Sequence, residues 1–322
     1  MSLARAIETG DLAELPSRRD EDWRWTDLRG LVREIPPAAL EVEAAPNTLF
    51  DALEADGVIV ARFVATEGSQ TASLPMVFEA GTVTTLLESY EHVGGGSVHS
   101  VDIDYELEDG AVVERIVLVD DAADAITVSQ AKVRLGKGAR FSQTVLASGA
   151  KRQRFETQVA HPGAGAQVRL DGVYLIAGGL HADLTTVVDH QGPNGTTSQL
   201  TKGAVGGTGR AVFQGRIIVA HGADGTDARM GHHALILGDK GEVDAKPELL
   251  IFADDVQCAH GNTVGALDEE ALFYARQRGI PEAAARAMLT EAFVGEVIDR
   301  IEHAGVREAA RVWVAEKLRG LQ

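Results

Sequence analysis

Residues 110–119 read GAVVERIVLV, a glycine turn followed directly by a β-like run. The same unit returns along the chain as GARFSQTVLA (138–147), GAQVRLDGVYLI (165–176), GRAVFQGRIIVA (209–220) and GEVDAKPELLIF (241–252). The starting glycines are 28 and 27 residues apart at first, and then 44 and 32 residues apart. This pattern indicates an imperfect repeat with about two strands in each unit.

Alternation inside these runs is typical of strands that bury one face. Phe213, Ile217 and Val219 fall on one side of the fourth run, and Gln214 and Arg216 fall on the other. The roughly even spacing, the short glycine corners and an aromatic content of only 5% favour a parallel β-solenoid. In such a fold each coil buries small branched side chains against its neighbours. A meandering antiparallel sandwich is the alternative.

The chain divides into three regions on this reading. We expect a helical and mixed N-terminal region over residues 1–96, the solenoid core over residues 97–265, and a C-terminal helical subdomain over residues 266–322. The segment VGGGSVHS (93–100) is typical of a flexible joint between the first two regions.

Helix signals mark the C-terminal region. Asp268 can cap a first helix that Gly279 ends. In the following helix Leu289, Phe293 and Val297 recur every four residues and make an apolar stripe. A stripe of this kind serves either as internal core or as a docking surface for a partner helix.

Composition excludes several classes of function. The 322 residues carry a formal net charge of −18, which argues against nucleic acid and anionic membrane as partners. The single cysteine excludes an internal disulfide framework and is typical of a cytoplasmic protein. No apolar run approaches the roughly 18 residues that a membrane span needs. The motifs of phosphate loops, dinucleotide-binding turns, zinc proteases and α/β-hydrolases are absent, so we expect no nucleotide hydrolysis by this chain.

The segment FADDVQCAHGNTVG (252–265) holds the only cysteine, and a histidine follows two places later. On an extended strand Cys258 and His260 point to the same side. Thiolate and imidazole suit iron, but two ligands make an incomplete site because tetrahedral centres need four. The missing ligands can come from His232 or His233 one coil away, or from another chain. The alternative is a small buried cysteine beside a hydrogen-bonded histidine.

Two long segments resemble one known family. The stretch HHALILGDKGEVDAKPELLIFADDVQCAHGNTVGALDEEALFYARQRGIPEAAARAMLTEAF (232–293) is similar to the SufB/SufD family of iron–sulfur cluster assembly scaffolds. Within it, KPEL, ADDVQCAHG and LFYARQRGI look like the SufD branch. The stretch EDWRWTDLRGL (21–31) resembles the N-terminal signature of the family. The two matches bracket the chain.

This resemblance implies a mainly β protein, with a right-handed parallel β-helix core between the two helical regions. It also implies a scaffold subunit that is not itself an enzyme: SufD pairs with SufB through the β-helix ends, and its C-terminal helices dock the ABC-type ATPase SufC. The nascent cluster is expected at the SufB–SufD interface, where the histidine of C-x-H matters. We therefore predict that His260, with Cys258 secondary, contributes to a transient iron–sulfur cluster or iron site shared with the partner. By the same resemblance we predict that Leu289, Phe293 and Val297 dock the ATPase.

The resemblance also separates the two branches of the family. SufB typically carries a functional cysteine on the strand matching HHALILGD, and ungapped matching places His232 there in this chain. A SufB-like scaffold that acts as a homodimer stays open, because Cys258 alone does not exclude it. A β-solenoid enzyme acting on carbohydrates is the alternative from another class, and the sparse aromatic residues argue against the sugar-stacking surface that it needs.

Overall fold

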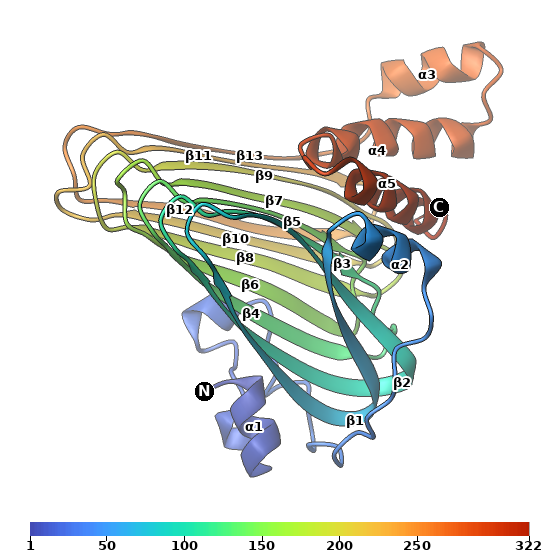
Figure 1. The fold of residues 1–322 in the computed structure, drawn as a ribbon. Coiled ribbons are helices and arrows are strands. Elements are labelled where there is room, and N and C mark those ends of the chain that lie inside the picture. Colours follow the sequence, from blue (N-terminus) through green and yellow to red (C-terminus); the bar gives the residue numbers. More distant parts are fainter. Residues whose placement is uncertain (322) are drawn as a thin grey trace.

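The computed structural model describes residues 1–321 and consists of one parallel β-solenoid with helices before and after it (Figure 1). The strands are β1 (Ile59–Phe78), β2 (Val83–Leu107), β3 (Val112–Val119), β4 (Ile126–Leu135), β5 (Arg140–Ala147), β6 (Arg152–His161), β7 (Gln167–Ile176), β8 (His181–His190), β9 (Thr196–Val205), β10 (Arg210–Val219), β11 (Asp227–Ile236), β12 (Glu242–Ile251) and β13 (Gln257–Gly265). The helices are α1 (Leu3–Thr9), α2 (Thr48–Ala55), α3 (Glu269–Gln277), α4 (Glu282–Ile298) and α5 (Ala304–Leu318), with 3-10 turns η1 (Leu12–Glu14) and η2 (Glu21–Trp23).

The strands stack as coils that have two faces. Odd-numbered strands from β3 to β13 build one face, which we call the odd face, and even-numbered strands from β4 to β12 build the even face. The long strands β1 and β2 run through both faces. The pairings between neighbouring strands are all parallel. The predicted parallel β-helix is therefore confirmed, and the antiparallel sandwich is excluded.

The length of a coil explains the glycine spacing. Val112 pairs with Arg140, and Arg140 pairs with Gln167, so the chain advances by 28 and then 27 residues per coil. The longer interval of 44 residues has a topological cause. Gly165 precedes β7 on the odd face, whereas Gly209 precedes β10 on the even face, so the interval spans a coil and a half.

The β-helix begins at Ile59, and the boundary expected at residue 97 falls inside β2. The glycine-rich segment 93–100, which the sequence suggested as a joint, belongs to that strand. Gly94 and Gly96 have φ angles of 82° and 72°, a backbone conformation that side chains with a Cβ rarely adopt. They let β2 turn from the odd face to the even face without leaving the sheet.

A completely buried ion pair joins the first coils. The guanidinium of Arg115 donates two hydrogen bonds to the Glu88 carboxylate, at 2.6 Å and 2.7 Å. The Tyr105 hydroxyl also donates to Glu88, and Arg115 donates further to Gln143. Removing one partner of such a pair leaves an unpaired buried charge, a change that typically costs about 3–5 kcal/mol.

The N-terminal segment lies along the even face. The Trp23 ring packs 4.3 Å from the Arg154 guanidinium, and the Thr26 hydroxyl donates to the buried Asp183. Farther along, Arg216 donates to Asp22 at 2.9 Å. Lys246 on β12 donates to Glu21 at 2.7 Å. This short segment therefore contacts four successive strands of the even face, from β6 to β12.

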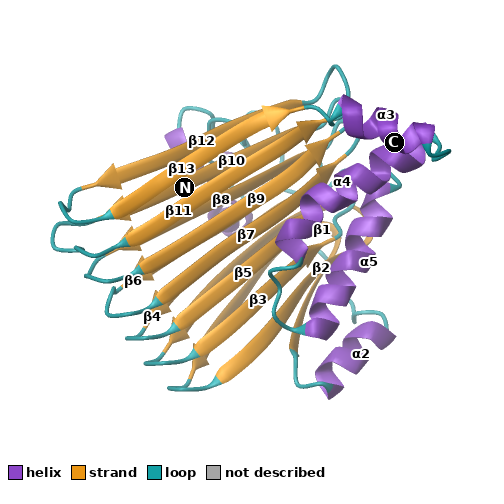
Figure 2. Cartoon of the chain, turned by 90° about the horizontal axis from the view of Figure 1, so that it is seen from above, coloured by secondary structure: helices purple, strands orange, loops and turns teal. Residues whose placement is uncertain are grey.

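The C-terminal helices cover part of the odd face. Figure 2 shows α4 and α5 across this face, with α3 farther out. Val294 and Trp313 of these helices share one buried cluster with Leu146 and Val173 of the sheet. Among residues 1–321, no helix combines the length and the apolar character needed to cross a bilayer.

Two buried histidines stack where β6 and β8 end. The rings of His161 and His190 lie 4.2 Å apart and nearly parallel, and both side chains are fully buried. His161 Nε2 donates to the Thr196 carbonyl, and Nδ1 accepts from the Gly163 amide. Burial lowers the pKa of both imidazoles, and for His190 the neighbouring His161 adds to the effect and the pKa falls to about 3.

We expect this pair to make the protein less stable in acid. Unfolded imidazoles have a pKa of about 6.5, so the unfolded state binds more protons once the pH falls below that value. The stability gained by keeping the pair neutral is fully present above about pH 6.5 and is lost as the pH falls toward the folded pKa values. Each histidine contributes up to about 1.4 kcal/mol per pH unit in that window. Urea unfolding at several pH values should show a shallower dependence for His161→Gln/His190→Gln than for wild type.

The matched control is His221→Gln, because His221 is exposed. This control should keep the wild-type dependence of unfolding free energy on pH. An unchanged dependence in the double variant would contradict the explanation.

Candidate functional site

The β-helix ends at β12 on the even face and β13 on the odd face (Figure 2). Within residues 1–321, β12 pairs with β10 and β13 pairs with β11, and neither has a strand on its other side. Their outward backbone N–H and C=O groups are therefore free to pair with another chain. Exposed apolar side chains lie at this end as well, namely Leu250, Ile251, Phe252 and Val264. We call this end, formed by β12 and β13, the open end.

Cys258 and His260 lie on the inward-facing side of β13. Cys258 is in register with Ala228 of β11 and His260 with Met230, and both β11 residues are buried in the interior. Cys258 is half-buried against the cluster that contains Phe213. His260, which lies on the outermost strand next to Met230, is exposed. The structure thus places both residues on one face of β13, at the open end.

The two side chains differ as metal ligands. Burial raises the pKa of the Cys258 thiol, and Asp227 adds to the rise while a hydrogen bond with the Ala228 backbone opposes it. Little thiolate is therefore present near neutral pH, and the thiolate is the form that binds metals. An imidazole binds metals as the neutral ring. His260 is the stronger candidate of the two.

His232 and His233 on β11 are both engaged elsewhere. His232 is fully buried, its Nδ1–H donates to Asn262 Oδ1 at 2.7 Å, and its Nε2 accepts from the Tyr174 hydroxyl at 2.9 Å. Burial lowers its pKa to about 4, so the ring is neutral at physiological pH. His233 points to the opposite side of the strand, where its Nδ1 is 2.8 Å from the Thr263 hydroxyl. Neither histidine joins His260.

The site is therefore incomplete in this chain. No group of three or more His, Cys, Asp and Glu side chains within the described residues is arranged to hold a metal ion. Cys258 and His260 supply at most two ligands to any such centre, and the open end leaves room for another chain to supply the others.

The apolar stripe of α4 faces the solenoid. Val297 is fully buried, and Leu289 and Phe293 are half-buried at the edge of the same cluster. The Phe293 ring lies 4.6 Å from the Lys202 ammonium on β9. In this conformation a partner can touch Leu289 and Phe293 only in part.

The exposed apolar residues of the C-terminal region lie elsewhere. Phe273 and Tyr274 of α3 are 61% and 60% exposed, and Met288 of α4 is also exposed. A groove of about 450 Å³ runs beside α4. Its lining includes Leu267, Ala287, Thr290, Leu318 and Leu321. Periodicity along α4 missed these residues, although two adjacent aromatic residues in a chain so poor in them were a usable signal.

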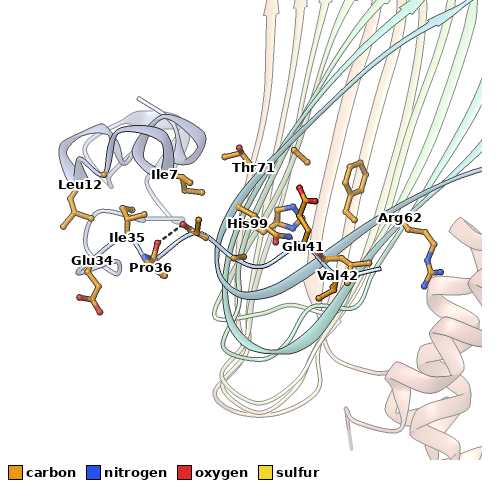
Figure 3. Close-up of a pocket in the computed structure, with 18 of the residues that line it drawn as sticks. Ile7, Leu12, Glu34, Ile35, Pro36, Glu41, Val42, Arg62, Thr71 and His99 are labelled. Atoms are coloured by element: carbon orange, nitrogen blue, oxygen red, sulfur yellow. Dashed lines mark hydrogen bonds between the residues drawn. The ribbon is translucent and has the colours of Figure 1, made fainter. Parts of the chain in front are cut away.

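A second hollow lies at the other end of the solenoid, beside β1 (Figure 3). It has a volume of about 1040 Å³, and its walls come from residues 7–12 and 33–44, from β1 and from His99 of β2. Burial lowers the pKa of His99 to about 4. The lining holds no second histidine and no cysteine, so the candidate site remains at the open end.

Comparison with known proteins identifies the family. A family profile described as "SUF system FeS cluster assembly, SufBD core domain" matches residues 62–293, which run from the first strand into α4. This chain belongs to the SufBD family. The family resemblance seen in its motifs is thereby confirmed, and the carbohydrate-active alternative finds no support.

Individual proteins that are similar to this chain belong to the same family. The chain is 27% identical to the iron–sulfur cluster assembly protein SufD of Escherichia coli, over 99% of its own length and 92% of the relative. It is 26% identical to a SufBD family protein of Mycobacterium tuberculosis, over 96% of its own length and 90% of the relative. It is 29% identical to a SufBD family protein of Synechocystis, where the match covers 75% of this chain but only 55% of the relative.

We expect Cys258 of this SufBD protein to react slowly with thiol reagents. Its thiol is half-buried and has a raised pKa, so the rate of alkylation should reach half its maximum above the value of about 8.5 that is usual for a free cysteine. Alkylation rates measured across pH with iodoacetamide test this expectation. A cysteine placed at exposed Val93 in a Cys258→Ala background is the control. A midpoint for Cys258 below that of the control would contradict it.

Proposed function

We propose that this chain is a SufD-like, non-catalytic scaffold subunit for iron–sulfur cluster assembly. In this proposal the open end pairs with a SufB-like subunit, and the C-terminal helices dock a SufC-like ABC ATPase. The observation that carries it is the unpaired edge of β12 and β13 with His260 exposed on its inward face.

Pairing at the open end follows from the physics of sheet edges. A partner that adds strands to β12 and β13 satisfies their free backbone groups and covers Leu250, Phe252 and Val264. The same contact brings the partner's ligands next to His260. A nascent cluster held there is cargo in transit, with part of its ligands from each chain.

His260→Ala should separate assembly of the complex from its chemistry. His260 is exposed, so its loss should leave folding and subunit pairing intact. Cluster formation on the purified complex, followed by absorbance, should fall by roughly tenfold or more, as is typical when a metal-site residue is lost. Cys258→Ala should stay within about twofold of wild type, because its thiol is rarely ionised at neutral pH.

His233→Ala is the matched control, since it removes a neighbouring imidazole from the other side of the sheet. A His260→Ala complex that forms clusters at the normal rate would remove His260 from the mechanism. A large loss of thermal stability together with loss of the complex would show a structural role instead.

Docking of the ATPase is proposed for the C-terminal helices. Phe273 and Tyr274 project from α3, and the groove beside α4 offers an apolar surface close to Met288. Exposed aromatic residues of this kind commonly dominate binding energy at interfaces. The proposed stripe contributes through the exposed parts of Leu289 and Phe293, and Val297 supports it from inside.

Point variants test the docking better than truncation. Deleting residues 266–322 would uncover the sheet residues that α4 and α5 bury, so loss of binding could reflect misfolding. Phe273→Ala/Tyr274→Ala should weaken ATPase binding by roughly tenfold or more, measured by calorimetry or co-purification, with thermal stability unchanged. Leu40→Ala is the control, because Leu40 is 81% exposed and lies in the N-terminal region. Unchanged binding by the double variant would place the interface elsewhere.

A homodimer is the second candidate assembly, because the open end can equally meet a second copy of this chain. Sedimentation of the isolated chain, followed by addition of the SufB-like subunit, distinguishes the two. A homodimer that does not exchange with that subunit would contradict the proposed pairing.

A further inference from the structure

We infer that His232 is a positioning residue, which holds the last strand through Asn262 and so sets the place of His260 at the open end. The inference rests on the proposed function in that it takes His260 as part of the shared site. The restraint that the His232–Asn262 hydrogen bond places on β13 can be measured without any cluster.

Contacts with three residues fix the ring of His232. It stacks on Phe213 of β10, with centroids 4.5 Å apart and planes within 4° of parallel. Tyr174 of β7 lies on another side, 5.9 Å away, and donates its hydroxyl proton to Nε2 at 2.9 Å. The remaining ring proton is on Nδ1 and is donated to Asn262 Oδ1 at 2.7 Å. One tautomer satisfies every contact, so the donor direction toward Asn262 is set by the interior of the protein.

Two glycines make room for this arrangement. The Tyr174 side chain passes over Gly203 of β9 and reaches His232. A Cβ at position 203 would lie 2.1 Å from the tyrosine ring. A Cβ at Gly215 would lie 2.1 Å from the Met230 sulfur and 2.9 Å from the Phe213 ring. No side chain fits at either position without moving the rings. The surroundings of His232 are thus shaped by residues on four strands.

The hydrogen bond matters because β13 is an edge strand. It is bonded through its backbone to β11 on one side, and most of its residues are exposed. Strands of this kind fray locally at much lower free energy than the core. Asn262 and His260 are two residues apart and face the same side of β13, so a bond at Asn262 restrains the histidine directly.

The neighbouring pair provides a comparison inside the molecule. His233 Nδ1 lies 2.8 Å from the Thr263 hydroxyl, between the same two strands. That contact lies on the outer side and is exposed, and within residues 1–321 no ring stacks on His233. Both pairs join an imidazole of β11 to a polar side chain of β13, and they differ in that the His232 ring is fully buried and stacked.

The test uses Asn262→Ala, because Asn262 is exposed and its loss removes the acceptor of the Nδ1 proton while the stacking of His232 on Phe213 is retained. In the full-length chain, amide hydrogen exchange over residues 257–265 should become roughly tenfold faster, with β5 and β7 unchanged. Asn262→Asp keeps an acceptor for the Nδ1 proton and should restore slow exchange. Thr263→Ala should change exchange by less than about twofold. Nitrogen NMR of the His232 ring should show the Nδ1–H form in wild type.

Cluster formation on the complex gives the second measurement. Asn262→Ala should lower it by about threefold or more, in the same direction as His260→Ala. Unchanged exchange over β13 in Asn262→Ala would overturn the inference. Faster exchange with normal cluster formation would overturn the link to His260, provided that His260→Ala is itself defective. If His260→Ala is normal, the proposed role of His260 fails, while the restraint on β13 still stands or falls on the exchange data.

Discussion

Each coil of this protein satisfies its backbone hydrogen bonds only through the coils before and after it, and the rest of the structure follows from that constraint. The sheet cannot pair the backbone groups at either of its ends by itself, because the last parallel strand there has no further strand to pair with. Polar backbone groups left at an end need water or another chain. The segment 36–39 contacts β1 at one end, through the pairing of Ala38 with Ser69. The β12 and β13 end has no such segment among the described residues, and this is where the candidate site lies.

The helices and the N-terminal segment cover the faces of the solenoid and leave this end free. Residues around Trp23 occupy the even face, and α4 with α5 occupies part of the odd face. Different regions of the surface therefore suit different contacts. The end offers backbone groups and an imidazole, whereas α3 offers exposed aromatic rings. In the proposed function, the two partners would therefore bind separate surfaces.

Much of the fold could be predicted from the sequence because the repeat is local: a glycine turn and an alternating run are visible in GAVVERIVLV. The first two coils were harder to predict because Gly94 and Gly96 suggested a joint where β2 continues, although Gly57 and Gly81 do precede β1 and β2. Spacing also placed Cys258 and His260 on one face. It could not tell that Val297 faces inward, since periodicity shows that a stripe exists but not what covers it. The partners of His232 were equally hidden, because Tyr174 and Phe213 come from other coils.

The N-terminal segment has a consequence for the order in which the molecule forms. Its contacts are with Arg154, Asp183, Arg216 and Lys246, which are 131 to 225 residues later in the chain. A ribosome delivers this segment before these strands, and the surface that receives it is complete only when β12 has been made. Leu28 packs in a cluster with Val98 and Ile126 of the first coils, whereas Trp23 meets Arg154 only after β6 has been made. The contacts of this one segment therefore form in steps, and its ion pairs with β10 and β12 come last.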